Sequence, residues 1–204
     1  MIRIFDILLS IMGIIVLFPL FFIIYLFVII ESKGGGFYTQ NRVGKDGVDF
    51  KLFKFRTMYM DSDINGLLTI GRRDSRLTKI GFVIRKYKID ELPQLFNVLI
   101  GDMSLVGPRP EVRKYVNLYT KDQLEVLKIR PGLTDYASIK YSNENSILGD
   151  SKNPELVYIN EIMHDKINLN MKYIQTQSIH VYFLIIFKTI YHFLEKLTTY
   201  IKLV

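Results

Sequence analysis

Residues 7–30 read ILLSIMGIIVLFPLFFIIYLFVII, an apolar run interrupted only by Ser10 and by the special cases Gly13 and Pro19. As a helix this run would be about 36 Å long, which is enough to cross a hydrocarbon core of about 30 Å. A cleaved signal peptide fits poorly, because the run is too long for one and no A-x-A site follows it. The stretch therefore predicts that the N-terminus anchors the chain in a membrane.

Pro19 lies inside this run and predicts a kink, because it cannot donate a hydrogen bond to the carbonyl of Ile15 and its ring clashes there. Two arrangements follow. The helix either spans the bilayer with a kink, or enters, bends at Pro19 and returns to the same face. The few flanking charges do not decide the orientation. The residues alone favour spanning, because proline is tolerated in membrane helices.

The composition of the whole chain limits the classes of function that fit it. The chain has 204 residues, a length typical of one compact domain with additions, and a net charge of +7 with a pI near 9.4. This balance favours anionic partners such as nucleic acid, acidic lipid or phosphorylated small molecules. The absence of cysteine excludes disulfides and cysteine metal sites, and the three histidines are too scattered to indicate zinc.

Turn signals divide the rest of the chain. Three glycines at 34–36 separate an anchor, residues 1–33, from a domain predicted over 34–178. Alternating apolar side chains predict strands at 37–42 and 48–53, joined by a turn at 44–47. Residues 60–78 are polar and are predicted to be mostly loop.

Capping residues predict three helices in this domain. The first covers 92–99, with Asp90 as its N-cap and Gly101 ending it. The second runs to about Ile129 and opens with a capping box at 120–123. The third begins at Pro154, with apolar residues expected along one face. That face comprises Leu156, Ile159 and Met163.

A second apolar stretch, 179–197, is predicted to be an amphipathic helix within a C-terminal segment, residues 179–204. A polar stripe formed by His180, Lys188, His192 and Lys196 recurs at multiples of four. That pattern suits a helix in the membrane interface, and equally a helix facing the core. A second spanning helix is less favourable, because Lys188 would lie near its centre.

Asp90 and Glu91 are adjacent carboxylates at a predicted helix start. The simplest interpretation is a capping carboxylate and a neighbour favoured by the helix dipole. The alternative is a nucleophile and its helper, because a carboxylate can attack phosphorus to form an acyl phosphate. Two acidic residues can also hold Mg²⁺ against pyrophosphate oxygens.

Basic residues surround this pair in sequence. Arg109 lies between Pro108 and Pro110, and Arg130 precedes Pro131, so both backbones are restrained. Rigidly placed arginines suit fork-like recognition of phosphate oxygens. No Walker loop or dinucleotide fingerprint is present. The candidate phosphate-binding residues are Lys54, Arg56, Arg85, Arg109 and Arg130.

In this order after an apolar run, four segments resemble the bacterial sugar transferases, the monotopic phosphoglycosyl transferases of glycoconjugate assembly, over nearly the whole chain. The segments are KFRTM at 54–58, DELPQLFNVL at 90–99, GDMSLVGPRP at 101–110 and RPGLT at 130–134. The short length is similar to that of the minimal members. Asp135-Tyr136 departs from a common Gly-Trp, and Phe18 precedes Pro19 where a serine is common.

The resemblance implies roles for these residues. Asp90 matches the family nucleophile, Glu91 matches its partner, and Mg²⁺ is the usual cofactor. The run with Pro19 matches a re-entrant helix-break-helix, which replaces the preference for spanning. The matched basic positions near the phosphates are Lys54, Arg56, Arg85 and Arg109.

The resulting expectation is an α/β, mainly helical, monotopic protein with a small β-hairpin and interfacial amphipathic helices. It would lie at the cytoplasmic face of the bacterial inner membrane. Its partners would be a UDP-sugar, polyprenyl (undecaprenyl) phosphate and membrane phospholipids rather than nucleic acid. The expected reaction transfers a phospho-sugar through a covalent aspartyl intermediate and releases UMP. The alternative is a non-catalytic basic scaffold that binds anionic lipid, for which carboxylates are not needed.

The first prediction concerns topology. With the bend at Pro19, a cysteine introduced near Met1 is labelled by a membrane-impermeant reagent only after the cytoplasmic side is opened. Pro19→Ala straightens the helix and moves a fraction of the molecules to the spanning form. Labelling of the otherwise unchanged chain from the periplasm would contradict the re-entrant arrangement.

Overall fold

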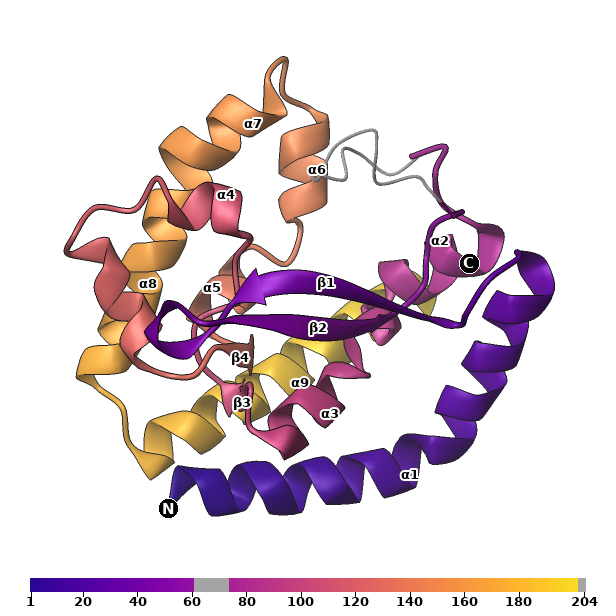
Figure 1. Ribbon diagram of the computed structural model, residues 1–204, viewed down its shortest axis with the longest axis horizontal. Coiled ribbons are helices and arrows are strands. Elements are labelled where there is room, and N and C mark those ends of the chain that lie inside the picture. The colour runs from indigo at the N-terminus through magenta and orange to yellow at the C-terminus, as the bar shows by residue number, and fades with distance from the viewer. Residues whose placement is uncertain (61–73, 202–204) are drawn as a thin grey trace.

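The longest element of the computed structural model, which describes residues 1–60 and 74–201, is helix α1, Ile2–Glu31. It is the one helix of the described residues that is long and apolar enough to cross a membrane. The helix continues through Pro19. Figure 1 shows that it bends, with a first part below the other elements and a second part that rises beside them. The expected N-terminal apolar helix is therefore present, with a bend in place of a break.

The predicted hairpin is confirmed. Strand β1, Phe37–Val43, pairs antiparallel with β2, Asp49–Phe55, through the short 3₁₀ turn η1, Lys45–Gly47. Figure 1 shows this twisted ribbon crossing the middle of the molecule. A second, parallel pair is formed by β3, Ser104–Val106, and β4, Gly132–Thr134.

The prediction that Asp90 caps a helix is wrong. Helix α3 covers Gln94–Ile100 with Pro93 at its N-cap, whereas Asp90 lies in a separate 3₁₀ turn, η3, Ile89–Glu91. The extra turn places the Asp90 side chain too early in the chain to reach the first amides of α3. Gly101 ends the helix at φ 106°, as predicted. Helix α2, Lys79–Lys86, precedes this region.

The capping box is confirmed by reciprocal bonds. The Thr120 amide donates to Gln123 Oε1 at 2.9 Å, and the Gln123 amide donates to Thr120 Oγ1 at 3.3 Å. The element that follows, η4, Gln123–Lys128, is a 3₁₀ helix instead of the expected α-helix. Of the predicted loop at 60–78, residues 61–73 lie outside the described residues, and the rest forms no helix.

The apolar face predicted for the helix that begins at Pro154 is confirmed in part. A π-helical turn, η5, Tyr158–Ile162, joins α7, Pro154–Val157, to α8, Met163–Gln175. Met163 is buried and Ile159 packs against the same core cluster, as predicted, whereas Leu156 is 52% exposed. The extra residue of the π turn also brings Tyr158 and Ile162 into the core. Three short helices complete this side: α4, Arg113–Val116, α5, Tyr136–Lys140, and α6, Glu144–Gly149.

The last helix, α9, Ile179–Ile201, faces the core along one side, as one of the two alternatives predicted. Tyr182 and Ile185 are fully buried, whereas Phe187 and Ile190 are at least half exposed. A single core cluster contains Tyr182 and Ile185 of α9 together with Val28 of α1. Both terminal helices therefore contribute to the core of the domain.

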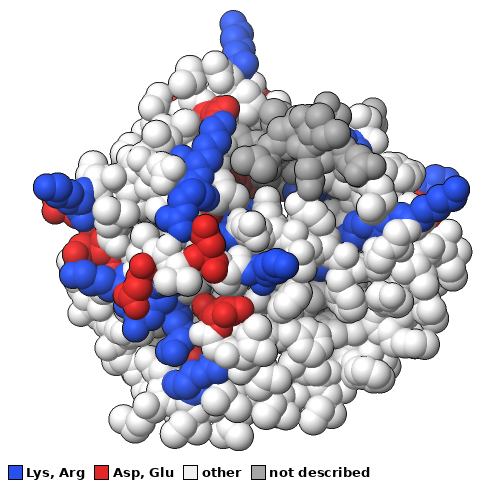
Figure 2. Space-filling model, in the orientation of Figure 1, with Lys and Arg blue, Asp and Glu red and all other residues white. Residues whose placement is uncertain are grey.

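Much of α1 is apolar and uncovered. Large side chains along it are exposed, among them Ile15, Val16 and Phe18, each at 64–70%. Figure 2 shows few charged side chains along the lower margin, where α1 runs, and many over the upper left. Such an uncovered apolar face is compatible with association with a membrane.

A buried carboxylate fixes the N-terminal part of α1 to the domain. Asp6 is only 2% exposed. Its Oδ1 accepts hydrogen bonds from Ser104 Oγ at 3.0 Å, the Leu105 amide at 2.9 Å and the Tyr182 hydroxyl at 2.8 Å. One side chain thus joins α1, β3 and α9.

The second prediction follows. Asp6→Ala leaves three buried donors without an acceptor, so the free energy of unfolding falls by about 3 kcal/mol or more. Thermal unfolding in detergent should show a midpoint lower by roughly 6 °C or more. Asp150→Ala, at an exposed position, serves as the control. A midpoint for Asp6→Ala equal to that of the control would show that these bonds do not anchor α1.

Candidate active site

Asp90 and Glu91 line a cavity of about 190 Å³. The turn η3 presents both carboxylates, and three other segments bring cations to them. Lys54 comes from β2, Arg85 from α2, and Arg109 from the loop after β3. Residues distant in sequence therefore assemble one compact charged site.

The backbone at Lys88 sets the direction of this turn. Lys88 has φ 53°, a left-handed conformation that non-glycine residues seldom adopt. It lies between α2 and η3 and also lines the cavity. An unfavourable backbone conformation beside two site carboxylates is typical of functional positions.

Glu91 is held by two cations. Its Oε2 accepts from Arg109 Nη1 at 3.0 Å, while its Oε1 accepts from Arg109 Nη2 and from Lys54 Nζ, the latter at 3.3 Å. The guanidinium meets the carboxylate in the two-pronged geometry that is the strongest form of this contact. Both oxygens of Glu91 are thus occupied.

Asp90 differs sharply from its neighbour. It is 6% exposed, and no hydrogen bond or ion pair within residues 1–60 and 74–201 holds its carboxylate. Burial, together with the negative charge of Glu91, raises the pKa of the Asp90 carboxyl to about 6. Near neutral pH it is therefore a largely ionised carboxylate with free oxygens.

The pKa of Glu91 moves in the opposite direction. Burial favours its neutral form, but Arg109 and Lys54 outweigh that effect and hold its pKa well below the usual range. Burial also lowers the pKa of Lys54. Two adjacent acids with pKa values pushed apart indicate a division of roles.

Two glycines fix the loop that carries Arg109. A Cβ on Gly107 would lie 2.4 Å from the Arg130 carbonyl oxygen, and one on Gly132 would lie 2.0 Å from the Gly107 nitrogen. Only glycine allows β3 and β4 to approach this closely. The Gly107 amide donates to Thr134 O at 3.0 Å.

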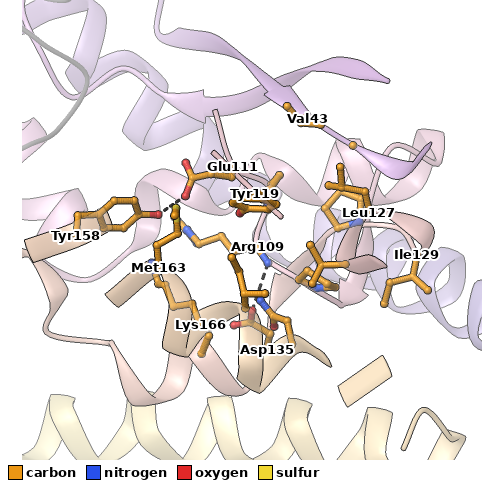
Figure 3. Close-up of a pocket in the computed structure, with 18 residues that line it drawn as sticks. Val43, Arg109, Glu111, Tyr119, Leu127, Ile129, Asp135, Tyr158, Met163 and Lys166 are labelled. Atoms are coloured by element: carbon orange, nitrogen blue, oxygen red, sulfur yellow. Dashed lines mark hydrogen bonds between the residues drawn. The ribbon is translucent and has the colours of Figure 1, made fainter. Parts of the chain in front are cut away.

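Asp135, at the start of the next helix, also restrains the loop that carries Arg109. Its Oδ2 accepts from the Arg109 amide at 3.3 Å, and its Oδ1 accepts from the Ser138 amide at 2.5 Å as the N-cap of α5. Figure 3 shows Asp135 directed toward the Arg109 backbone beside a smaller cavity of about 40 Å³. The position of Arg109 is therefore fixed by buried contacts on both sides.

Glu111 borders both cavities and is held by two side chains. Arg42 contacts Glu111 at 3.2 Å, and the Tyr158 hydroxyl donates to the same carboxylate, as Figure 3 shows. The Arg42 guanidinium also donates to Pro110 O at 3.2 Å. This contact supports the segment immediately after Arg109.

The structure brings together most of the predicted site. Lys54, Arg85 and Arg109 line the cavity with the two carboxylates. Arg56 and Arg130 do not line it. Arg56 donates to the carbonyls that end α1, including Ser32 O at 2.8 Å, and Arg130 donates to Gly101 O at 2.9 Å.

Sequence reasoning missed four lining or supporting residues: Arg42, Lys88, Asp135 and Lys166. Asp135 had a local signal, because an Asp three residues before Ser138 fits an N-cap. The other three depend on contacts across the fold that no local pattern indicates.

The sequence of this chain is similar to those of known proteins over most of its length. The model of a family described as bacterial sugar transferase matches residues 1–196. The chain is 37% identical over 188 residues to a UDP-N-acetylgalactosamine-undecaprenyl-phosphate N-acetylgalactosaminephosphotransferase of Aeromonas hydrophila, covering 91% of the chain and 41% of that protein. It is 37% identical over 195 residues to an undecaprenyl-phosphate glucose phosphotransferase of Komagataeibacter xylinus, covering 92% and 35%.

A third relative is of similar size. The exopolysaccharide production protein ExoY of Rhizobium meliloti is 34% identical over 203 residues, with 92% of the chain and 83% of that protein covered. The chain therefore spans less than half the length of the first two relatives and most of the third.

The third prediction concerns the titration of Asp90. With ¹³C-carboxyl labelling, and Asp90→Asn to assign the signal, the carboxyl should titrate with a midpoint of about 6. Glu91→Gln removes the neighbouring like charge, so the midpoint should fall. A midpoint near the ordinary value of about 4 in the unchanged protein would contradict this electrostatic arrangement.

Proposed function

Because the chain belongs to the bacterial sugar transferase family, we propose that it transfers a sugar phosphate from a UDP-sugar to polyprenyl (undecaprenyl) phosphate and releases UMP. The observation that carries the proposal is the pair of unlike carboxylates. Asp90 is buried and has no partner among the described residues, and Glu91 beside it is held by Arg109 and Lys54. The names of two relatives include undecaprenyl phosphate and a sugar phosphotransfer.

Asp90 is the better nucleophile of the two. Its oxygens accept no hydrogen bond from the part of the chain that the structure describes, and its raised pKa makes it a stronger base than an ordinary aspartate. Glu91 would have to break its contacts with Arg109 and Lys54 to react. Glu91 acts instead by orienting those two cations beside Asp90.

The reaction has two displacements. An Asp90 oxygen attacks the phosphorus that bears the sugar, and the bond from that phosphorus to the UMP oxygen breaks, so that UMP leaves with the electron pair. An oxygen of the polyprenyl phosphate then attacks the same phosphorus and restores the Asp90 carboxylate. Dividing the transfer in this way avoids bringing a soluble donor and a membrane-bound acceptor together at once.

The cations stabilise charge on the diphosphate. Two of the five guanidinium donors of Arg109 bind Glu91, and others remain for phosphate oxygens. Arg85 and Lys88 also line the cavity and favour the ionised form of Asp90. Fixed charges of this kind stabilise a transition state without having to reorganise.

Mg²⁺ is the proposed cofactor. It prefers oxygen ligands and is commonly bound by one or two carboxylates together with substrate phosphates. No group of three or more acidic or histidine side chains suits a metal within the described ranges. Neither oxygen of Asp90 has a partner in the described ranges, while those of Glu91 accept bonds from Arg109 and Lys54, so of the two predicted ligands Asp90 would hold the ion through one oxygen and attack with the other. Bound there, the ion would neutralise phosphate charge.

We also propose that α1 is re-entrant and that the domain lies at the cytoplasmic face of the inner membrane. Both ends of α1 contact the same domain. Arg3 donates to Val98 O at 2.6 Å and Leu99 O at 2.9 Å, and Val28 lies in the core. A straight spanning helix would separate these contacts across the bilayer.

The fourth prediction tests the covalent step. Enzyme incubated with Mg²⁺ and a UDP-sugar labelled in the sugar, without lipid acceptor, should release about one UMP per active site and retain the label on the protein. Digestion and mass spectrometry should place the label on Asp90. Adding polyprenyl phosphate should transfer the label to lipid.

Asp90→Asn removes the nucleophile while preserving its shape, so UMP release and label retention should both vanish with the thermal midpoint retained. Asp150→Asn, at an exposed position, should behave as the unchanged enzyme. UDP as the nucleotide product, or turnover with no trapped label, would rule out the proposed mechanism.

A further inference from the structure

The cavity that contains Asp90 has two chemically different parts. One part is the cationic group beside the carboxylates, described above. The other comes from residues 138–166 and carries hydroxyl groups and an internal ion pair. Cations suit the diphosphate, which leaves the second part without an assigned ligand.

Ser138 lines this second part, and its hydroxyl makes no hydrogen bond to any described residue. Its Oγ is also buried. The Ser138 backbone is fixed by the bond from its amide to Asp135. A buried hydroxyl without a partner is unfavourable for folding, so a hydrogen bond to a ligand group at this position would be favourable.

Glu144 and Lys166 place an acceptor and a donor side by side. Lys166 Nζ lies 2.6 Å from Glu144 Oε2, and the side chains are only 13% and 23% exposed, respectively. Both residues line the cavity. Neighbouring sugar hydroxyls each donate and accept, so a paired carboxylate and ammonium group match them.

Helix α9 holds the turn between these groups. The Ser142 hydroxyl lies 2.9 Å from His192 Nε2, and Lys196 Nζ donates to Asn143 Oδ1 at 2.9 Å. Supporting contacts of this kind restrict the positions of groups that bind a ligand. This part of the cavity is therefore ordered before a donor binds.

The size of the cavity favours the sugar over the nucleoside. Its volume of about 190 Å³ is below the roughly 300–1,000 Å³ typical of pockets that enclose a whole drug-sized ligand. In the proposed reaction, the phosphorus attacked by Asp90 carries the sugar. In that reaction the sugar phosphate lies in this cavity, which is too small to enclose the nucleoside as well.

We propose that Ser138, Glu144 and Lys166 form a subsite that binds the hydroxyl groups of the transferred sugar and sets the choice among UDP-hexoses. The proposal rests on the proposed function, because that reaction places the sugar beside Asp90. In this proposal, residues on α5, α6 and α8 select the sugar, and other residues bind the phosphates.

The test measures the affinity that the sugar adds to the nucleotide. All variants are made in the full chain carrying Asp90→Asn, which prevents transfer. Calorimetry gives dissociation constants for UDP and for UDP-glucose, UDP-galactose, UDP-N-acetylglucosamine and UDP-N-acetylgalactosamine. Ser138→Ala should weaken the preferred UDP-sugar about fivefold and Glu144→Gln about tenfold or more, while UDP binding stays within about twofold.

Two controls separate binding from folding. Ser138→Ala removes an unpartnered hydroxyl, so the thermal midpoint should not fall. Glu155→Gln breaks the exposed Lys114–Glu155 ion pair outside this cavity and should leave every dissociation constant unchanged. Equal weakening of UDP and all four UDP-sugars, or no weakening at all, would overturn the sugar subsite. Enzyme with Asp90 intact that binds the donors yet releases no UMP would contradict the proposed function and leave the subsite standing.

Discussion

The contact between Glu91 and Arg109 decides which of two adjacent carboxylates is free to react. Two nearby carboxylates in one buried site repel each other, and one of them normally takes up a proton. Here Arg109 and Lys54 neutralise Glu91, so its partner can ionise near neutral pH while keeping a raised pKa. Other residues hold these groups in place. Gly107, Gly132 and Asp135 fix the loop that carries Arg109. The turn at Lys88 sets the direction of Asp90.

Charged side chains at and around α1 also stabilise its contacts with the neighbouring helices. Arg3 binds the last carbonyls of α3, Arg56 binds those of α1, and both oxygens of Glu31 accept the first amides of α2 at 2.6 and 2.8 Å. Helix ends leave such groups unsatisfied, so these charges cap the helices. The membrane helix is thereby joined to the two helices on either side of η3. This explains why counting the flanking charges did not indicate an orientation.

The sequence predicted the features that depend on local patterns. The hairpin follows from alternation and a turn at 44–47, whereas the grouping of Asp90, Glu91, Lys54, Arg85 and Arg109 follows from the resemblance to the bacterial sugar transferases. Other features arise only when distant segments meet. Arg56 resembles a phosphate ligand in sequence, yet the end of α1 occupies its guanidinium. The π turn at Tyr158–Ile162 was not predicted, because no residue type marks such a turn, and Leu156 of the predicted apolar face is exposed.

The central claim, that Asp90 attacks first and the lipid second, predicts a stereochemical outcome. A UDP-sugar with sulfur replacing one non-bridging oxygen at the phosphorus bearing the sugar is chiral at that atom. Each in-line displacement inverts the configuration, so two displacements restore it. The account predicts that the polyprenyl diphosphate-sugar product retains the donor configuration. Inversion would demonstrate a single direct transfer and contradict the account.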